Sequence, residues 1–211
     1  MSSQQPSQLS CSDFAAALAA REPVPGGGGT AALAAALGAA LCSMAGAFTL
    51  GKKRYAAYEE DLSRMLLQAE EIRLRLLGLV DEDARGVREL MEVFDLPKDD
   101  PRRVAELERL MVAACGSPLA VMGEVARASL LLEEMGQKCS TLLVSDVGCG
   151  AQLCRAALEA ASLNVLVNAR ALSDRERARD LVARCDALLD ECLPRLERTA
   201  SRVTETLRGG D

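Results

Sequence analysis

Two long stretches without strong polarity stand out in the pattern of hydrophobic and polar positions along this chain. The first, from Ala31 to Leu50, contains no charged side chain and is long enough to span a membrane. Its residues are mostly Ala and Gly, which gain little from lipid, whereas small side chains suit a helix enclosed by its neighbours. The second stretch follows Ser145-Asp146, which we expect to cap a largely uncharged helix reaching Ala171. We therefore expect two buried apolar helices, with a membrane span as the alternative for the first.

A long amphipathic helix is predicted from Tyr55 to Phe94, with room for a kink near Gly78 or Gly86. Asp83 lies in register with its apolar stripe, at a position where a hydrophobic residue is expected, whereas Asp81 and Glu82 lie off the stripe. The stripe consists of Leu62, Leu66, Ala69, Ile72, Leu76, Val80, Val87, Leu90 and Phe94, which recur at helical spacing.

Capping residues and prolines predict the remaining helices. Ser12 caps a short helix from Phe14 to Ala20, which ends before Pro23 and Pro25. Asp100-Pro101 starts one helix and Ser117-Pro118 starts another that runs to Met135. A polar linker follows from Gly136 to Ser140. Ser173-Asp174 then begins a capping box that leads into a helix to Leu207, kinked at Pro194.

No segment has the period-two alternation of a strand, so the predicted fold class is all-α without a sheet. We expect a helical bundle built around the two apolar helices, with the amphipathic helices outside. Residues 10–208 form a single domain in this interpretation. The polar residues 1–9 form a disordered N-terminal tail.

Composition agrees with a globular helical protein: 49% of the 211 residues are hydrophobic and only 2% are aromatic, which disfavours strands. The net charge of −6 argues against a nucleic-acid partner, which would require a concentrated basic face. Eight cysteines occur without a CxxC pair, and histidine is absent. We therefore expect no metal site and a reducing, cytoplasmic location. Without an imidazole, any proton transfer must use a carboxylate, a lysine, a tyrosine, a thiol or the substrate itself.

Three features could carry chemistry, and each has a structural alternative. Gly26–Gly29 would present backbone N–H groups to an anion at a helix start, or simply form a flexible or tightly packed segment. Asp83 would have a raised pKa if it were buried without a partner, or it would form a structural ion pair. Asn164 and Asn168 share one helix face and either bind a ligand or join two helices through hydrogen bonds.

Three motifs together resemble one family. PVPGGGGTAALAAALGAALCSMAGAFTLGKKRY, LVDEDARGVRELMEVFDLPK and SDVGCGAQLCRAALEAASLNVLVNARAL are similar, in order, to the formiminotetrahydrofolate cyclodeaminase and methenyltetrahydrofolate cyclohydrolase family. The similarity extends from about Ser10 to Glu205. Two segments depart from the family pattern, namely Gly29-Thr30 and the linker Gln137-Lys138-Cys139.

The resemblance implies an all-helical homodimer that holds a tetrahydrofolate derivative in a groove. With the composition, it leads us to expect no metal, nucleic acid or membrane partner, and no cofactor beyond the folate substrate. The resemblance also implies that the reaction takes place at the C1 unit that bridges N5 and N10 of tetrahydrofolate. The reaction is either hydrolysis of the methenyl bridge or cyclodeamination of a formimino group. A non-catalytic helical folate-binding or scaffold protein is the alternative. The site residues carried over are Asp83, Asp81 and Asp146 as catalytic, and Gly27, Gly28, Lys52, Tyr55, Asn164 and Asn168 as substrate-binding.

Overall fold

The computed structural model describes residues 5–209, apart from the side chains of residues 104 and 105. All regular elements in this range are helical, which confirms the all-α prediction. The α-helices are α1 (Cys11–Ala19), α2 (Gly27–Thr49), α3 (Glu59–Phe94), α4 (Pro101–Lys138), α5 (Val144–Ala171) and α6 (Arg175–Leu207), and the short 3-10 turns are η1 (Pro6–Gln8), η2 (Lys53–Tyr58) and η3 (Thr141–Leu143).

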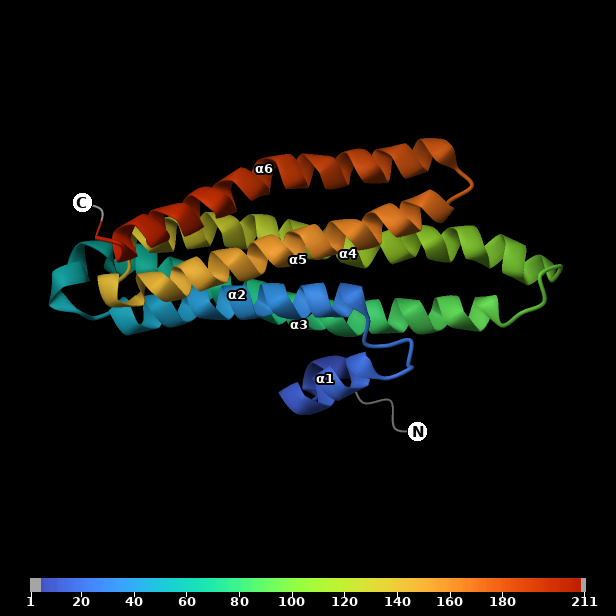
Figure 1. Ribbon diagram of the computed structural model, residues 1–211, viewed down its shortest axis with the longest axis horizontal. Coiled ribbons are helices and arrows are strands. Elements are labelled where there is room, and N and C mark those ends of the chain that lie inside the picture. The colour runs from blue at the N-terminus through green and yellow to red at the C-terminus, as the bar shows by residue number, and fades with distance from the viewer. Residues whose placement is uncertain (1–4, 210–211) are drawn as a thin grey trace.

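The five long helices lie side by side along the long axis of the molecule, and α1 lies outside them against one flank (Figure 1). Helix α2 packs most extensively against α5 and α3, and α5 also packs against α4 and α6. Small residues allow this close approach: a Cβ on Gly38 would lie 2.6 Å from the Cys154 Sγ and 2.9 Å from the Gly150 carbonyl oxygen. The expected bundle around two apolar helices is therefore correct.

Several predicted helix boundaries were wrong. The Ser117-Pro118 pair does not start a helix, because α4 continues through Pro118 from Pro101 to Lys138. The predicted linker at 136–140 is correspondingly shorter. Ser145-Asp146 does not cap α5, since the helix begins at Val144 and its N-cap Leu143 makes no side-chain cap. At Pro118, tertiary packing carries α4 past a local stop signal, whereas α5 begins one residue before its predicted cap.

Other local signals worked. The Asp174 carboxylate accepts hydrogen bonds from the Glu176 and Arg177 N–H groups at the start of α6, so the helix begins where the sequence predicted. The capping box itself was wrong, because Asp174 rather than Ser173 is the N-cap and the Ser173 N–H donates to Glu108 instead. Asp100 likewise caps α4. Helix α1 begins slightly earlier than expected, with Ser10 rather than Ser12 as its cap.

The N-terminal segment differs from the disordered tail expected for residues 1–9. Residues 1–4 lie outside the described range, but Pro6 is buried and η1 packs against α3. The Ser7 N–H and Oγ both donate to the Asp81 carboxylate, at 3.0 and 2.6 Å. These contacts hold the segment in place, and they could not be anticipated from its polar composition.

The uncharged helix α2 and part of α4 are long and apolar enough to cross a membrane by length and composition. Half of the apolar window of α2 is, however, buried inside the bundle. Its fully buried residues include Ala32, Ala35 and Ala45. This is the environment of a core helix.

Candidate functional site

A groove of about 540 Å³ lies at one end of the bundle, where four helices converge. Its walls are the start of α2, residues 82–90 of α3, residues 110–120 of α4, and the Asn164-Asn168 face of α5. Five of the predicted site residues line it: Gly27, Gly28, Asp83, Asn164 and Asn168. The three sequence motifs are far apart along the chain, and each contributes residues to this groove.

Asp83 is the only one of the three predicted catalytic carboxylates that lines this groove. It lies where the stripe of α3 leaves the core, just beyond the fully buried Val80. Its Oδ2 accepts a hydrogen bond from the Gly29 N–H at 2.8 Å. Burial raises the pKa of Asp83, and the bond from Gly29 opposes this rise in part. The helix N-terminus supplies partial positive charge next to the carboxylate.

A structural ion pair does not explain Asp83. No Lys or Arg among the described residues forms a salt bridge with it, and no cation contributes to its pKa shift. Arg75 lines the same groove, but its guanidinium pairs with Glu82 at 2.5 Å. Asp83 is therefore a partly buried carboxylate that faces a groove and is held by one backbone donor, as a proton carrier would be.

The glycines at the start of α2 allow this approach. A Cβ on Gly28 would lie 2.3 Å from the Asp83 Oδ1, which is closer than real Cβ contacts permit. At Gly27 a Cβ would meet the Asn164 amide at 3.7 Å, an ordinary contact distance. The Gly26–Gly29 run is thus neither a flexible linker nor an isolated anion site. Gly26 is the N-cap, and the next three glycines form the first turn of α2 against Asp83.

The two predicted asparagines use their amide nitrogens differently. The Asn164 Nδ2 donates to the Ala160 carbonyl of its own helix, at 2.9 Å. The Asn168 Nδ2 donates across to the Ala114 carbonyl of α4, also at 2.9 Å. Both side chains line the groove. The Asn168 nitrogen therefore joins two helices through a hydrogen bond, which was the structural alternative for this residue, while its oxygen is left available to a ligand.

Sequence reasoning missed the α4 wall. Its residues at the groove are small, including Ala113, Gly116, Ser117 and Ala120, and they leave space for a flat ligand. The Ser117 Oγ is buried without a hydrogen-bond partner. The spacing of small residues was a usable signal, but Ser117-Pro118 was interpreted as a helix start and the wall went unrecognised.

Asp81 does not line the groove. Its carboxylate accepts the two hydrogen bonds from Ser7 and so anchors η1. Because Asp81 lies two residues before Asp83 on α3, the two side chains point to different faces of the helix.

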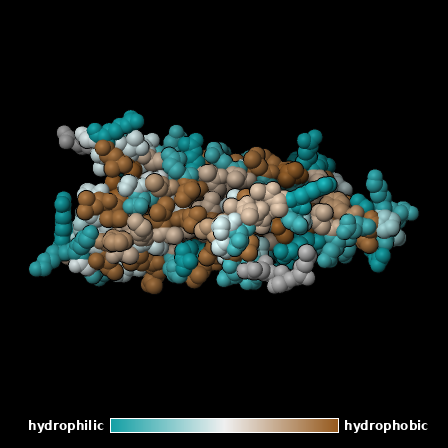
Figure 2. Space-filling view, turned by 60° about the horizontal axis from the view of Figure 1, so that its bottom comes forward, coloured by the Kyte–Doolittle hydropathy of each residue, from teal (hydrophilic) through white to brown (hydrophobic). Residues whose placement is uncertain are grey.

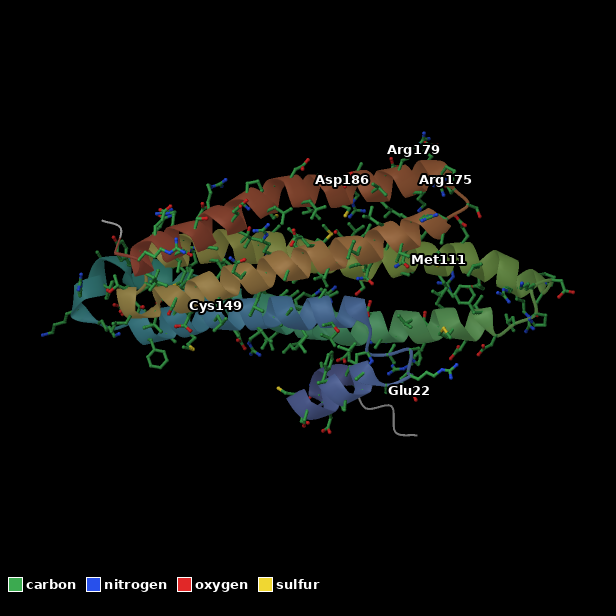
Figure 3. All side chains as sticks on the ribbon, in the orientation of Figure 1. Glu22, Met111, Cys149, Arg175, Arg179 and Asp186 are labelled. Atoms are coloured by element: carbon green, nitrogen blue, oxygen red, sulfur yellow. The ribbon has the colours of Figure 1, made fainter. Side chains whose placement is uncertain are left out.

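The other three predicted residues, Lys52, Tyr55 and Asp146, lie at the opposite end of the bundle. The Gly27 and Thr49 ends of α2 are about 33 Å apart, because an α-helix rises 1.5 Å per residue. In Figure 3 the labelled Cys149 marks the α5 turn near Asp146, and the labelled Met111 lies on α4 at the groove end.

At that opposite end, the Tyr55 Oη accepts a hydrogen bond from the Thr141 N–H at 3.4 Å. Hydrogen bonding with Ser140 lowers the pKa of Tyr55. Within one chain, these side chains are too far from Asp83 to act on the same substrate atom.

The cysteine thiols form no metal cluster in the described part of the chain, and the most deeply buried of them are unreactive. All eight are free, and no group of three Cys, Asp or Glu side chains within the described part of the chain is placed to hold a metal. Burial raises the pKa of Cys42 and of Cys154 to about 12, so both thiols are protonated near neutral pH.

Comparison with known proteins gives a consistent result. A family model described as formiminotransferase-cyclodeaminase matches residues 10–187. The chain is 35% identical to the methenyltetrahydrofolate cyclohydrolase of Methylorubrum extorquens, over 84% of this chain and 88% of that protein. It is 31% identical to the formimidoyltransferase-cyclodeaminase of Sus scrofa, of which it spans about a third, since 34% of that protein is covered. Its fold matches the crystal structure of formiminotetrahydrofolate cyclodeaminase from Thermotoga maritima with a TM-score of 0.81 and 26% identity, covering 93% of this chain and 98% of that one.

Proposed function

The chain belongs to the formiminotransferase-cyclodeaminase family, and from this premise we propose that it hydrolyses 5,10-methenyltetrahydrofolate to 10-formyltetrahydrofolate. The relative named for this reaction is matched along most of its length. The bifunctional animal relatives, by contrast, extend well beyond the matched region. No cofactor beyond the folate substrate is needed.

The observation that carries the proposal is the position of Asp83. Its carboxylate faces the groove, is held by the Gly29 N–H and has a raised pKa because of burial. A raised pKa brings a carboxyl group closer to neutrality, where it can both accept and return a proton. The chain has no histidine that could do this instead.

The proposed hydrolysis uses this carboxylate twice. Asp83 accepts a proton from water as the water oxygen bonds to the carbon that bridges N5 and N10. It then gives that proton to N5 as the bond between the carbon and N5 breaks. The hydroxyl on the same carbon releases its proton to solvent, which leaves the formyl group on N10. One water is consumed and one proton is released in total.

Cyclodeamination of 5-formiminotetrahydrofolate is the second candidate, supported by the fold match to the Thermotoga maritima protein named for it. Here N10 attacks the carbon of the protonated formimino group, the proton lost by N10 passes to Asp83, and Asp83 delivers it to the NH2 group, which departs as ammonia and leaves the methenyl cation. The same groove and carboxylate serve both reactions, because both pass through a carbon bonded to N5 and N10.

The rest of the groove suits a folate. Small residues of α4 leave a slot for the pterin ring, and the amide oxygens of Asn164 and Asn168 can accept hydrogen bonds from its N–H groups. Arg85 lines the same groove and supplies positive charge for the glutamate tail, whereas the guanidinium of Arg75 is paired with Glu82. Within one chain, Arg85 takes the role that the sequence favoured for the Lys52 cluster.

We further propose a homodimer that forms through the outer face of α2 and α5. Leu37 and Phe48 of α2 are 52% and 60% exposed, and Leu163 and Val167 of α5 are 66% and 62% exposed. Figure 2 shows apolar residues gathered along the half of the visible face over which α2 runs. The 23 residues of α2 give a face about 34 Å long and, with α5, about 20 Å wide. The resulting ~700 Å² approaches the roughly 800 Å² per partner of stable complexes.

A second copy suits this surface better than a membrane does. Helix α2 carries no charge, so two copies can meet without a charge penalty, and half of its apolar window is already buried in the bundle. A twofold axis that lies in the interface and runs perpendicular to α2 pairs the α2 helices in antiparallel orientation. That arrangement moves the Lys52-Tyr55 end of one copy toward the Gly27 end of the other. A soluble dimer in the reducing cytoplasm would also keep the free thiols reduced.

The proposal is tested by incubating purified protein with each folate and following the methenyl absorbance. A cyclohydrolase bleaches 5,10-methenyltetrahydrofolate. A cyclodeaminase instead produces the methenyl absorbance and ammonia from 5-formiminotetrahydrofolate. Binding of either folate without any change in absorbance would favour the non-catalytic binding protein.

A further inference from the structure

Pro118 lies inside α4, a helix that continues for many residues on both sides of it. Proline has no backbone N–H, so the carbonyl four residues earlier loses its helical donor. That carbonyl belongs to Ala114. The proline ring also crowds the same carbonyl and turns it away from the helical ladder. The sequence thus creates one unpaired acceptor in the middle of α4.

The unpaired acceptor is used by another helix. The Nδ2 of Asn168, on α5, donates a hydrogen bond to the Ala114 carbonyl oxygen at 2.9 Å. The two residues are 54 positions apart in the chain, so the bond is a tertiary contact. Asn164, one turn earlier on the same helix, makes no such bond and instead donates to its own helix.

This contact fixes which end of the Asn168 amide faces the groove. A backbone carbonyl only accepts hydrogen bonds, so it binds the nitrogen of an amide and never the oxygen. With the nitrogen held by Ala114, the oxygen of Asn168 is left as the free polar atom. No donor to that oxygen occurs within residues 5–209, and Asn168 lines the groove.

We propose that Pro118 is a positioning residue of the substrate site: it leaves the Ala114 carbonyl free to anchor Asn168, which then presents an acceptor to the substrate. This inference rests on the proposed function, because the acceptor needs a donor such as a pterin N–H. The neighbouring Ser117 also lines the groove, and its buried hydroxyl has no hydrogen-bond partner. The same turn of α4 therefore offers the substrate a second polar group.

The test is Pro118→Ala, assayed with 5,10-methenyltetrahydrofolate. The restored N–H at position 118 pairs with the Ala114 carbonyl, draws it back into the helical ladder and so weakens its hydrogen bond from Asn168. We expect KM to rise about three- to tenfold, the range of one hydrogen bond, with kcat changed less than about twofold. The melting temperature should hold or rise, because an interior proline destabilises a helix. In an Asn168→Ala background, the same substitution should raise KM no further.

Pro194→Ala is the matched control. Pro194 also lies inside a helix, α6, but it is exposed and distant from the groove, so its removal should leave KM unchanged. If the wild-type enzyme turns over substrate and Pro118→Ala has a wild-type KM, the inference is wrong while the proposed function stands. The inference is also wrong if Pro118→Ala raises KM equally in the Asn168→Ala background. A wild-type protein that turns over neither folate would instead overturn the proposed function, and the inference with it.

Discussion

Asp83 occupies the one position on α3 where helical periodicity calls for a hydrophobic residue and the chain supplies a carboxylate. That anomaly could be recognised from the sequence alone. Its hydrogen bond from Gly29 could not, because the relative register of two helices depends on packing and is not encoded in the pattern of either one.

The raised pKa of Asp83 predicts how stability depends on pH. Between the ordinary carboxyl pKa of 3.8 and the higher pKa of Asp83 in the folded state, the folded protein binds more protons than the unfolded chain. The free energy of unfolding therefore falls as pH rises through this window. Asp83→Asn removes this loss, so the variant should gain stability relative to wild type as the pH rises above about 4, by roughly 1 kcal/mol.

Chemical denaturation of both proteins across that pH range measures the effect. If the stability advantage of Asp83→Asn over wild type shrinks as the pH rises toward neutrality, the pKa of Asp83 in the folded protein is lowered, as in an ion pair. That result would contradict the environment assigned to Asp83.

Gly28 and Gly27 form a matched pair for testing the close approach of α2 to Asp83. Gly28→Ala should displace the carboxylate, because the new Cβ would lie 2.3 Å from its Oδ1. We expect turnover to fall at least about tenfold. Gly27→Ala places its Cβ at an ordinary 3.7 Å from Asn164 and should be tolerated. Steady-state kinetics and melting temperatures of the two variants decide this, and equal activities would contradict the close contact.

At the scale of elements, capping signals were reliable where they stood at exposed ends, as with Asp100 and Asp174. They failed where a helix was packed along its whole length. Ser117-Pro118 resembles a helix start, but α4 packs against α5 and α6, and this packing outweighs one missing hydrogen bond. The same error concealed the α4 wall of the groove.

The link between α3 and the N-terminal segment gives an element-scale prediction. Asp81→Ala removes the acceptor of both Ser7 hydrogen bonds, so η1 should detach more often. Hydrogen exchange at residues 7–9 should accelerate about five- to thirtyfold, corresponding to roughly 1–2 kcal/mol.

Turnover in Asp81→Ala should change little, because Asp81 does not line the groove. Ser7→Ala, which removes the hydroxyl donor alone, should give a smaller acceleration of exchange. A large loss of turnover in Asp81→Ala without loss of folded protein would instead return Asp81 to the mechanism.

At the scale of the whole molecule, the three sequence motifs divide between two ends of one bundle. Helical periodicity predicted the fold class and the buried helices, but the distance between the ends depends on helix lengths and on the continuity of α4. Gly28, Asp83, Asn164 and Asn168 meet at one groove. Lys52, Tyr55 and Asp146 do not reach it within a single chain.

The proposed dimer predicts the effect of a charge on the exposed α2 face. Leu37→Glu should yield a monomer, because an unpaired carboxylate is unfavourable in an apolar interface. Its KM for folate should rise if the Lys52 end of the partner contributes to binding. Light scattering at micromolar concentration gives the mass. A monomeric wild-type protein, or a wild-type protein that needs detergent to stay in solution, would contradict the dimer.

The most direct test of the central claim, that Asp83 is the proton carrier of this groove, is the single-turnover rate of Asp83→Asn measured with its melting temperature. The substitution keeps the shape of the side chain and an acceptor for the Gly29 N–H. Turnover should fall about 10²–10⁴-fold while the melting temperature holds or rises. Asp81→Asn, whose side chain faces Ser7 outside the groove, should retain most activity. A destabilised Asp83→Asn protein whose folded fraction reacts at the wild-type rate would contradict the account.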